Sequence, residues 1–175
     1  MNRPRTVLIR TWRTENAISE CTGSAFQVPA TYPGIATVVG AVFGEDPLGS
    51  SVAATIDLAS IATGNQRRVN HLRSADVLEA EKYPSMSYRS TGIRRTDDRW
   101  IVDGEQTVHG VTRPVPLAVE VNGFARDPHR GQRAGFCATA QINRRDFGIT
   151  IPMGGGGVVS DKVSISLKIQ AVLQT

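Results

Sequence analysis

The chain has 175 residues, of which 40% are hydrophobic and 21% charged, and no apolar run approaches the roughly 20 residues of a membrane-spanning helix. This composition excludes a disordered chain and predicts no stable membrane insertion, and the length predicts one domain over residues 1–175 rather than a multidomain enzyme. The net charge of +4 arises from 20 basic and 16 acidic residues, with the basic residues spread along the chain. Because no basic stripe with interleaved aromatic residues occurs, we expect no nucleic-acid partner.

The first 43 residues show weaker patterns than the rest of the chain. Residues 6–12 and 35–43 carry apolar runs that can form strands, whereas residues 19–34 are interpreted as a loop. The short apolar run at residues 7–9 cannot serve as the core of an export signal, so we expect a cytoplasmic protein. Cys21 and Cys137 lie far apart without metal-binding or redox spacing, and we interpret both as free, buried thiols.

After residue 50, apolar and polar residues alternate in six segments. The first segment, VAATIDL, places Val52, Ala54 and Ile56 on one face, and this period of two predicts a half-buried strand. The same pattern returns within residues 86–90, 100–102, 115–121, 136–142 and 163–169. Turn residues separate the segments at 96–98, 110–114, 127–131 and 154–157. Links this short favour antiparallel neighbours.

One segment interrupts the alternation. Residues 63–82 are long enough for one or two short helices, with Ser74 as a candidate N-cap and Asp76 in the first turn, where a carboxylate favours the helix dipole. Pro84 then returns the chain to extended geometry. A sheet of many strands that is apolar on one face can bury that face by closing into a barrel or by pairing into a sandwich. With one helical excursion attached, the pattern favours an antiparallel barrel.

Five stretches of the chain carry distinctive motifs, at residues 44–61, 71–91, 107–121, 134–149 and 159–172. The most specific motifs are HLRS…KYP, HGVT and INRRDFG, and their joint occurrence in this order is a strong signal. Together these stretches resemble one known family, the YceI-like or polyisoprenoid-binding proteins. The family's usual opening motifs are not clear in residues 13–43. We therefore divide the chain into an atypical part, 1–43, and a family-like part, 44–175; a divergent N-terminus or a shifted reading frame upstream of Gly44 would both produce this division.

The resemblance implies an eight-stranded antiparallel lipocalin-like barrel that holds a long-chain isoprenoid or fatty amphiphile. A barrel of about eight strands is wide enough for one slender ligand. If the apolar faces point inward, the ligand-binding wall consists of Val52, Ala54, Ile56, Met86, Tyr88, Trp100, Val102, Leu117, Val119, Phe136, Ala138, Ile142, Ile165 and Leu167. The same residues could instead form a solid core, in which case the protein is an interaction module that dimerises through an exposed strand edge.

Arginines near the family motifs are candidates for binding a diphosphate or carboxylate headgroup. Guanidinium groups recognise such anions through paired hydrogen bonds. Arg67, Arg68 and Arg73 lie in the helical excursion, and Arg144 and Arg145 lie in the INRRDFG turn. Either group could lie at a barrel mouth, although Arg144 could equally fix its own turn by pairing with Asp146.

We expect no catalytic site, no metal and no cofactor. The sequence contains neither GxSxG nor HExxH, and the glycines at 154–157 precede a strand rather than the helix that follows a phosphate-binding loop. His71, His109 and His129 are interpreted as structural hydrogen-bonding residues because they lie in a helix, at a strand end and in a loop, without convergent ligands.

Overall fold

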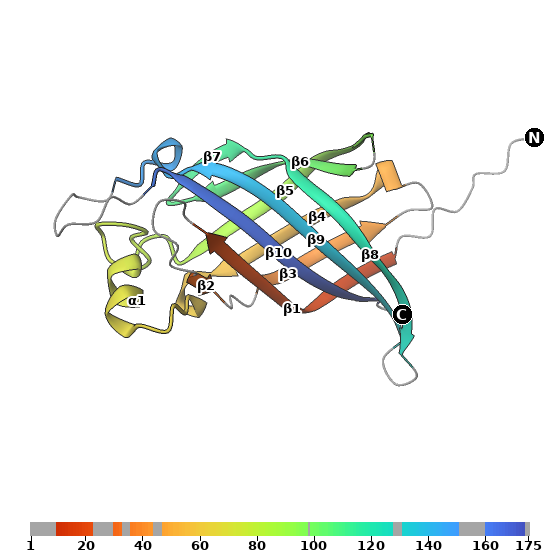
Figure 1. Cartoon of the computed structure of the whole chain (residues 1–175), viewed down its shortest axis with the longest axis horizontal. Coiled ribbons are helices and arrows are strands. Elements are labelled where there is room, and N and C mark those ends of the chain that lie inside the picture. Colours follow the sequence, from red (N-terminus) through yellow and green to blue (C-terminus); the bar gives the residue numbers. More distant parts are fainter. Residues whose placement is uncertain are drawn as a thin grey trace, which may run out of the picture.

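A computed structural model describes residues 10–22, 30–32, 36–43, 47–97, 99–127, 131–150 and 160–173. These residues form ten strands, one short α-helix and three 3₁₀ turns (Figure 1). The strands are β1 Arg10–Thr22, β2 Ala30–Tyr32, β3 Ala36–Phe43, β4 Ser51–Asp57, β5 Ser85–Thr96, β6 Arg99–Val108, β7 Val111–Pro114, β8 Leu117–Asp127, β9 Gly131–Asn143 and β10 Lys162–Leu173. The helix is α1 Gln66–Arg73, and the 3₁₀ turns are η1 Pro47–Gly49, η2 Leu58–Ser60 and η3 Arg144–Phe147.

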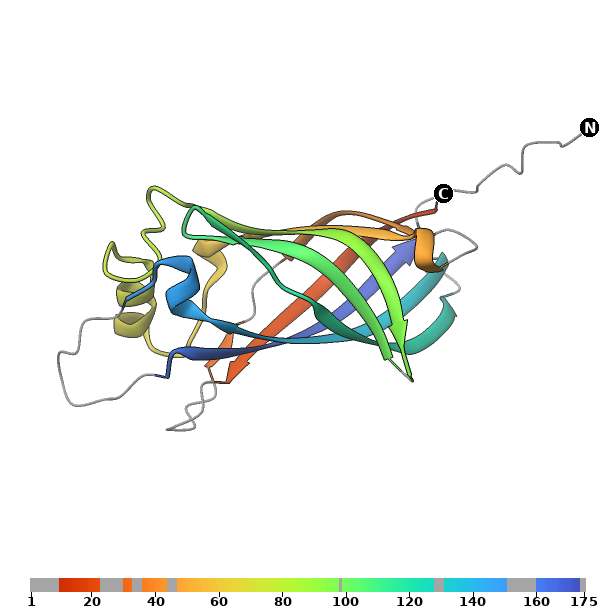
Figure 2. The ribbon, with the colours of Figure 1, turned by 90° about the horizontal axis from the view of Figure 1, so that it is seen from above.

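All strands belong to one antiparallel sheet that curls around the long axis of the molecule (Figures 1 and 2). The order of pairing is β10-β9-β8-β6-β5-β4-β3-β1, and β1 also pairs with β10, so the pairings of these strands form a cycle. Strand β2 pairs with β1, and β7 pairs with β6. The expected class, a mostly β antiparallel fold with a short helical segment, is confirmed.

The six alternating segments predicted from the sequence correspond to strands β4, β5, β6, β8, β9 and β10, except that Leu58 begins η2 and Val115 lies in the link before β8. One interpretation of a connecting segment was wrong, and another is not tested by the described residues. The turn expected at 110–114 is confined to His109 and Gly110, because the next four residues pair with β6 as β7. The expected glycine turn at 154–157 lies outside the described residues.

The N-terminal region contains more strand than its composition indicates. Part of the expected loop at 19–34 belongs to β1, which extends to Thr22, and another part is β2. Strand β1 pairs with β10 along most of its length. The backbone hydrogen bonds of a long partner strand therefore outweigh the weak strand propensity of this segment.

The helical excursion has its helix earlier than predicted. Helix α1 begins after Asn65, whose side-chain oxygen accepts a hydrogen bond from the backbone N–H of Arg68 at 3.2 Å. Ser74 is the C-cap and not the N-cap, and its hydroxyl donates to the carbonyl of His71 at 2.8 Å. Asn and Ser are both favoured N-caps, and the prediction of Ser74 as the N-cap was wrong. Across the part of the chain that the structure describes, helices are too short to span a bilayer.

One end of the curled sheet is filled with apolar side chains. Helix α1 and η3 both lie at this end (Figure 1). Residues from outside the long strands belong to the same buried cluster as the strand residues. They are Val77 after α1, Val115 between β7 and β8, Phe147 in η3 and Ile149 just after η3. We call this the filled end.

Candidate functional site

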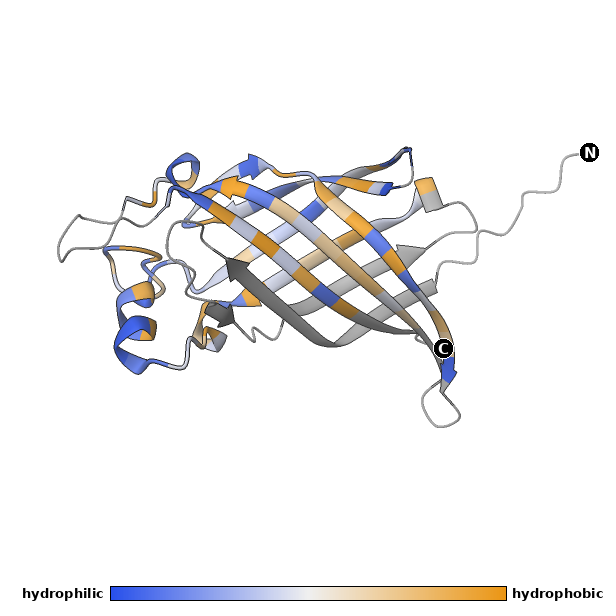
Figure 3. Cartoon of the chain, in the orientation of Figure 1, coloured by the Kyte–Doolittle hydropathy of each residue, from blue (hydrophilic) through white to orange (hydrophobic). Residues whose placement is uncertain are grey.

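The strand register aligns apolar side chains of neighbouring strands on one face of the sheet. Val102 lies opposite Leu117, and Val119 lies opposite Ala138. Ala138 in turn lies opposite Leu167. Directly opposed residues of antiparallel strands share a face, so an apolar stripe runs from β6 across β8 and β9 to β10. The alternating colours of Figure 3 follow the same pattern along these strands. We call this the inner face.

The structure brings the whole predicted ligand-binding wall to this inner face. Most of its members are either buried in the apolar cluster or packed against it: Val52, Ala54, Met86, Tyr88, Val102, Leu117, Val119, Ala138, Ile142 and Leu167. The others are partly buried and lie opposite inner-face residues, with Ile56 opposite Met86, Trp100 opposite Val119, Phe136 opposite Val121 and Ile165 opposite Ala140.

The exposure of inner-face side chains rises along β8. Leu117 is 7% exposed, Val119 is partly buried, Val121 is 44% exposed and Phe124 is 73% exposed. Phe124 remains on the inner face because it lies opposite Ala134, which alternates with Phe136 on β9. Strand β8 runs away from the filled end as exposure increases (Figure 1). The inner face is therefore solvent-exposed at the opposite end, which we call the open end and which includes the β5–β6 turn and the distal part of β8.

Tyr88 is the polar member of the wall, and its environment explains its burial. Its hydroxyl lies 3.0 Å from the carbonyl oxygen of Val102 and 3.1 Å from that of Val115, and it donates to this pair. Burial, followed by the nearby Asp103 carboxylate, raises the pKa of this hydroxyl well above its ordinary value. A side chain at Gly104 would collide with the tyrosine ring, so the glycine makes room for it. The hydroxyl is therefore satisfied by the fold itself.

A β-bulge in β5 changes which arginine faces inward. The pairing register between β5 and β6 shifts between Ser90 and Gly92, so Arg95 lies opposite Trp100. The guanidinium carbon of Arg95 is 5.5 Å from the centroid of the indole ring. Arg94 faces outward and binds Asp103 through two hydrogen bonds of 2.7 and 3.2 Å. Strict alternation from Met86 would have placed Arg94 inside. The signal that could have revealed Arg95 is the glycine within the strand, which often marks a bulge.

Two of the predicted headgroup arginines, Arg73 and Arg144, bond to groups within the fold. The guanidinium of Arg73 donates to the carbonyl oxygens of Leu58, Ala59 and Ile61, at 3.2 Å for Leu58 and 3.4 Å for Ile61. These bonds tie α1 to η2.

Arg144 is buried and makes similar internal contacts. It donates to the carbonyl oxygens of Ile149 at 2.9 Å and Ser160 at 3.3 Å, and it pairs with Asp161 at 2.6 Å. Arg145 pairs with the same carboxylate at 2.7 Å. The partner of Arg144 is thus Asp161, and not Asp146 as weighed from the sequence.

The remaining headgroup candidates, Arg67 and Arg68, lie on α1 at the filled end. Within the described residues, neither guanidinium takes part in a hydrogen bond or ion pair. The structure therefore separates these arginines from the open end of the sheet by the length of the strands (Figure 1).

The three most specific sequence motifs meet at the filled end. Nδ1 of His109 lies 3.4 Å from the carbonyl oxygen of Phe147, and Nε2 lies 3.4 Å from a carboxylate oxygen of Glu79. The Tyr83 ring packs edge-on against the imidazole at a centroid distance of 5.0 Å. Gly110 has a φ of +73° and faces the tyrosine ring, which leaves no space for a side chain. The structural role predicted for His109 is confirmed, and the motifs prove to hold the filled end together.

No metal site emerges from the part of the chain that the structure describes, where groups of three His, Cys, Asp or Glu side chains in ligating arrangement are absent. His71 is exposed on α1, and His129 lies outside the described residues. Cys137 is a free thiol, as expected, but it is partly exposed on the outer face and its sulfur accepts a hydrogen bond from Asn122 at 3.1 Å.

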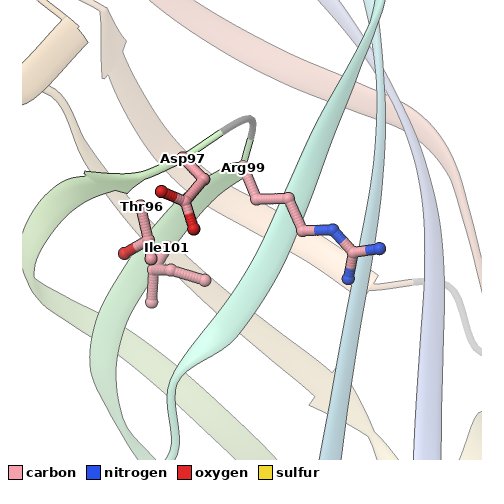
Figure 4. A pocket seen from close by; sticks show the side chains of 4 residues that line it. All are labelled: Thr96, Asp97, Arg99 and Ile101. Carbon is pink, nitrogen blue, oxygen red and sulfur yellow. The ribbon is translucent and has the colours of Figure 1, made fainter.

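Two surface hollows lie in the part of the chain that the structure describes, and the larger of them is away from the inner face. The larger, about 270 Å³, is lined by Thr96, Asp97, Arg99 and Ile101 at the β5–β6 turn (Figure 4). Arg99 and Ile101 alternate with Trp100, so this hollow lies on the outer side of β6. A smaller hollow of about 120 Å³ lies where β7, β9 and η3 meet. Neither hollow has the continuous apolar lining that a long hydrocarbon chain needs.

The chain matches the model of the YceI-like domain over residues 12–171. The protein belongs to the YceI-like domain family. The matched range begins well before residue 44, where the motifs read from the sequence start. A UPF0312 protein from Pseudomonas putida is 36% identical to this YceI-like chain over 129 residues, which cover 73% of the chain and 65% of the relative. The chain thus spans slightly less than two thirds of the length of that relative.

Solved structures share the fold. The crystal structure of BcnA from Burkholderia cenocepacia has a TM-score of 0.72 at 21% identity, covering 89% of this chain and 96% of BcnA. A protein described as a polyisoprenoid binding domain from Saccharophagus degradans, implicated in plant cell wall breakdown, has a TM-score of 0.57 at 14% identity. The match covers 93% of this chain and 98% of that domain. At these identities the likeness concerns the fold alone.

Proposed function

We propose that this YceI-like protein is a non-catalytic carrier that holds one long-chain isoprenoid or related amphiphilic lipid inside a lipocalin-like barrel. The observation that supports the proposal most strongly is the rise in exposure of the inner face along β8, from 7% at Leu117 to 73% at Phe124. An apolar face that is accessible from one end offers a route for a hydrocarbon chain. The cycle of paired strands supplies a wall around that route.

The energetics favour a long, weakly polar ligand. Each buried CH₂ group contributes about 0.8 kcal/mol, so a chain of tens of carbons gains affinity without specific polar contacts. The inner face consists mainly of Val, Ile, Leu, Met and aromatic side chains. The polyisoprenoid binding domain from Saccharophagus degradans supports an isoprenoid as the ligand class.

The direct test is to extract the freshly purified protein with organic solvent and to identify the extract by mass spectrometry. We expect a prenyl or fatty lipid in about equimolar amount. We also expect Met86→Arg to abolish retention, because it places a charge on the inner face, whereas Ser87→Arg, on the opposite face of β5, retains the lipid. Far-UV circular dichroism ensures that the variants are compared as folded proteins. A lipid-free wild-type protein, or equal retention by both variants, would contradict the proposal.

A second candidate function is a homodimeric interaction module without a lipid. The observation in its favour is the edge of β8: β6 pairs with β8 at residues 117–119, whereas β9 pairs with β8 as far as Asp127. Among the described residues, the distal half of β8 therefore has a strand on one side only, and open edges recruit partner strands. Light scattering coupled to size-exclusion chromatography distinguishes the two candidates, since the module requires a stable dimer that contains no extractable lipid.

A further inference from the structure

Two consecutive arginines on β5 have opposite electrostatic environments. The guanidinium of Arg94 is neutralised on the outer face by Asp103, through a bidentate pair. Arg95 is exposed, and its guanidinium lies over the Trp100 ring without an ion pair among the described residues. The difference follows from the bulge between Ser90 and Gly92, which turns Arg95 toward the inner face.

Arg95 lies at the open end of the apolar stripe. It is opposite Trp100, which is itself opposite Val119, so the cation borders the same inner face that carries the proposed ligand wall. It is also the penultimate residue of β5, next to the turn that leads to β6. Asp97, which follows β5 in that turn, lines the outer hollow together with Thr96 and Ile101 (Figure 4).

The chemistry of this pair favours an anion. A guanidinium over an indole face is held in place by a cation–π interaction while its N–H groups stay available. Those N–H groups match the two oxygens of a carboxylate or phosphate in a planar, bidentate arrangement. A ligand that places its chain along the inner face leaves its polar end at the open end, where Arg95 lies.

We propose that Arg95, positioned by Trp100, binds the acidic headgroup of the carried lipid and selects carboxylate- or phosphate-bearing amphiphiles over neutral ones. This inference rests on the proposed carrier function. It places headgroup recognition at the opposite end of the molecule from α1 and η3. Arg73 and Arg144 are already engaged by carbonyl and carboxylate groups at the filled end.

The test compares acidic and neutral probes that share a chain of similar length. Geranylgeranyl phosphate is paired with geranylgeraniol, and phytanic acid with phytol, so the two arms separate phosphate from carboxylate. Dissociation constants are measured for wild-type protein, for Arg95→Gln and for the matched control Arg94→Gln. We expect Arg95→Gln to weaken binding of at least one acidic probe by about tenfold or more, and to change binding of the alcohols by less than about twofold. Arg94→Gln should leave all four probes unchanged.

Each outcome has a separate meaning. Selective loss of phosphate binding assigns the site to phosphorylated lipids, and selective loss of carboxylate binding assigns it to acids. If Arg95→Gln and Arg94→Gln bind the acidic probes equally, the headgroup assignment is overturned while the carrier function stands. If wild-type protein binds none of the four probes, the carrier function fails and the inference fails with it. A third variant, Arg95→Lys, should restore part of the preference, since it keeps the charge but not the planar donor pair.

Discussion

The two ends of the curled sheet differ in how deeply the apolar inner face is buried. At the filled end Phe147 is 1% exposed and belongs to the buried cluster together with Val77 and Ile149. At the open end Phe124 is 73% exposed although it lies on the same face of the sheet as the buried Leu117. The difference teaches that strand alternation defines a face, whereas α1, η3 and the loops around them decide where that face becomes a packed core.

The largest expected effect is a loss of stability when a side chain is removed at the filled end. Phe147→Ala removes a fully buried aromatic side chain, and we expect it to lower the free energy of unfolding by about 3–5 kcal/mol. Urea titration followed by tryptophan fluorescence measures this change. A loss below about 1 kcal/mol would show that the filled end is not tightly packed, and the contrast between the ends would break down.

Tyr88 belongs to the buried cluster, and its hydroxyl provides the next prediction. Removal of its hydroxyl in Tyr88→Phe leaves two buried carbonyl oxygens without that donor, and we expect a loss of about 1–2 kcal/mol near neutral pH.

The same substitution has a pH-dependent signature. Burial raises the pKa of Tyr88 in the folded protein, so the unfolded chain releases this proton at lower pH than the folded one. The free energy of unfolding of the wild type should therefore fall as pH rises above the ordinary tyrosine pKa of about 10. The free energy of unfolding of the Tyr88→Phe variant should fall less steeply over the same range. Urea titrations from pH 8 to 10.5 measure both slopes. Parallel slopes for the two proteins would mean that Tyr88 ionises as freely when folded as when unfolded.

The smallest expected effect is at the open end. Phe124→Ala removes the same side chain as Phe147→Ala, but from an exposed position, and we expect the free energy of unfolding to change by less than about 0.5 kcal/mol. The same urea titration serves for both variants, which makes them a matched pair. A loss comparable to that of Phe147→Ala would mean that something covers the open end in solution.

Sequence patterns predicted much of this molecule, but unevenly. The alternation in residues 52–58, 136–142 and 163–169 identified strands and the faces of their side chains, because a period of two is a direct consequence of strand geometry. The start of α1 was missed because Asn65 and Ser74 are both good caps and the segment has weak periodicity.

The predicted headgroup arginines show a different limit of sequence patterns. Arg67, Arg68, Arg73 and Arg144 were chosen for their position near motifs, yet the motifs hold the filled end together, and two of these arginines bond to backbone carbonyls there. Proximity in sequence to a specific motif does not reveal what that motif packs against.

The sequence by itself determined the antiparallel β class, the apolar inner face and the family, since these depend on local periodicity and on short motifs. The tertiary structure alone decided which end of that face is filled, that β1 pairs with β10, and that Arg95 rather than Arg94 borders the interior. These features depend on contacts between residues distant in the chain and on a single bulge. One extra residue in a strand reverses the facing of every residue after it, and simple alternation does not show where that reversal falls.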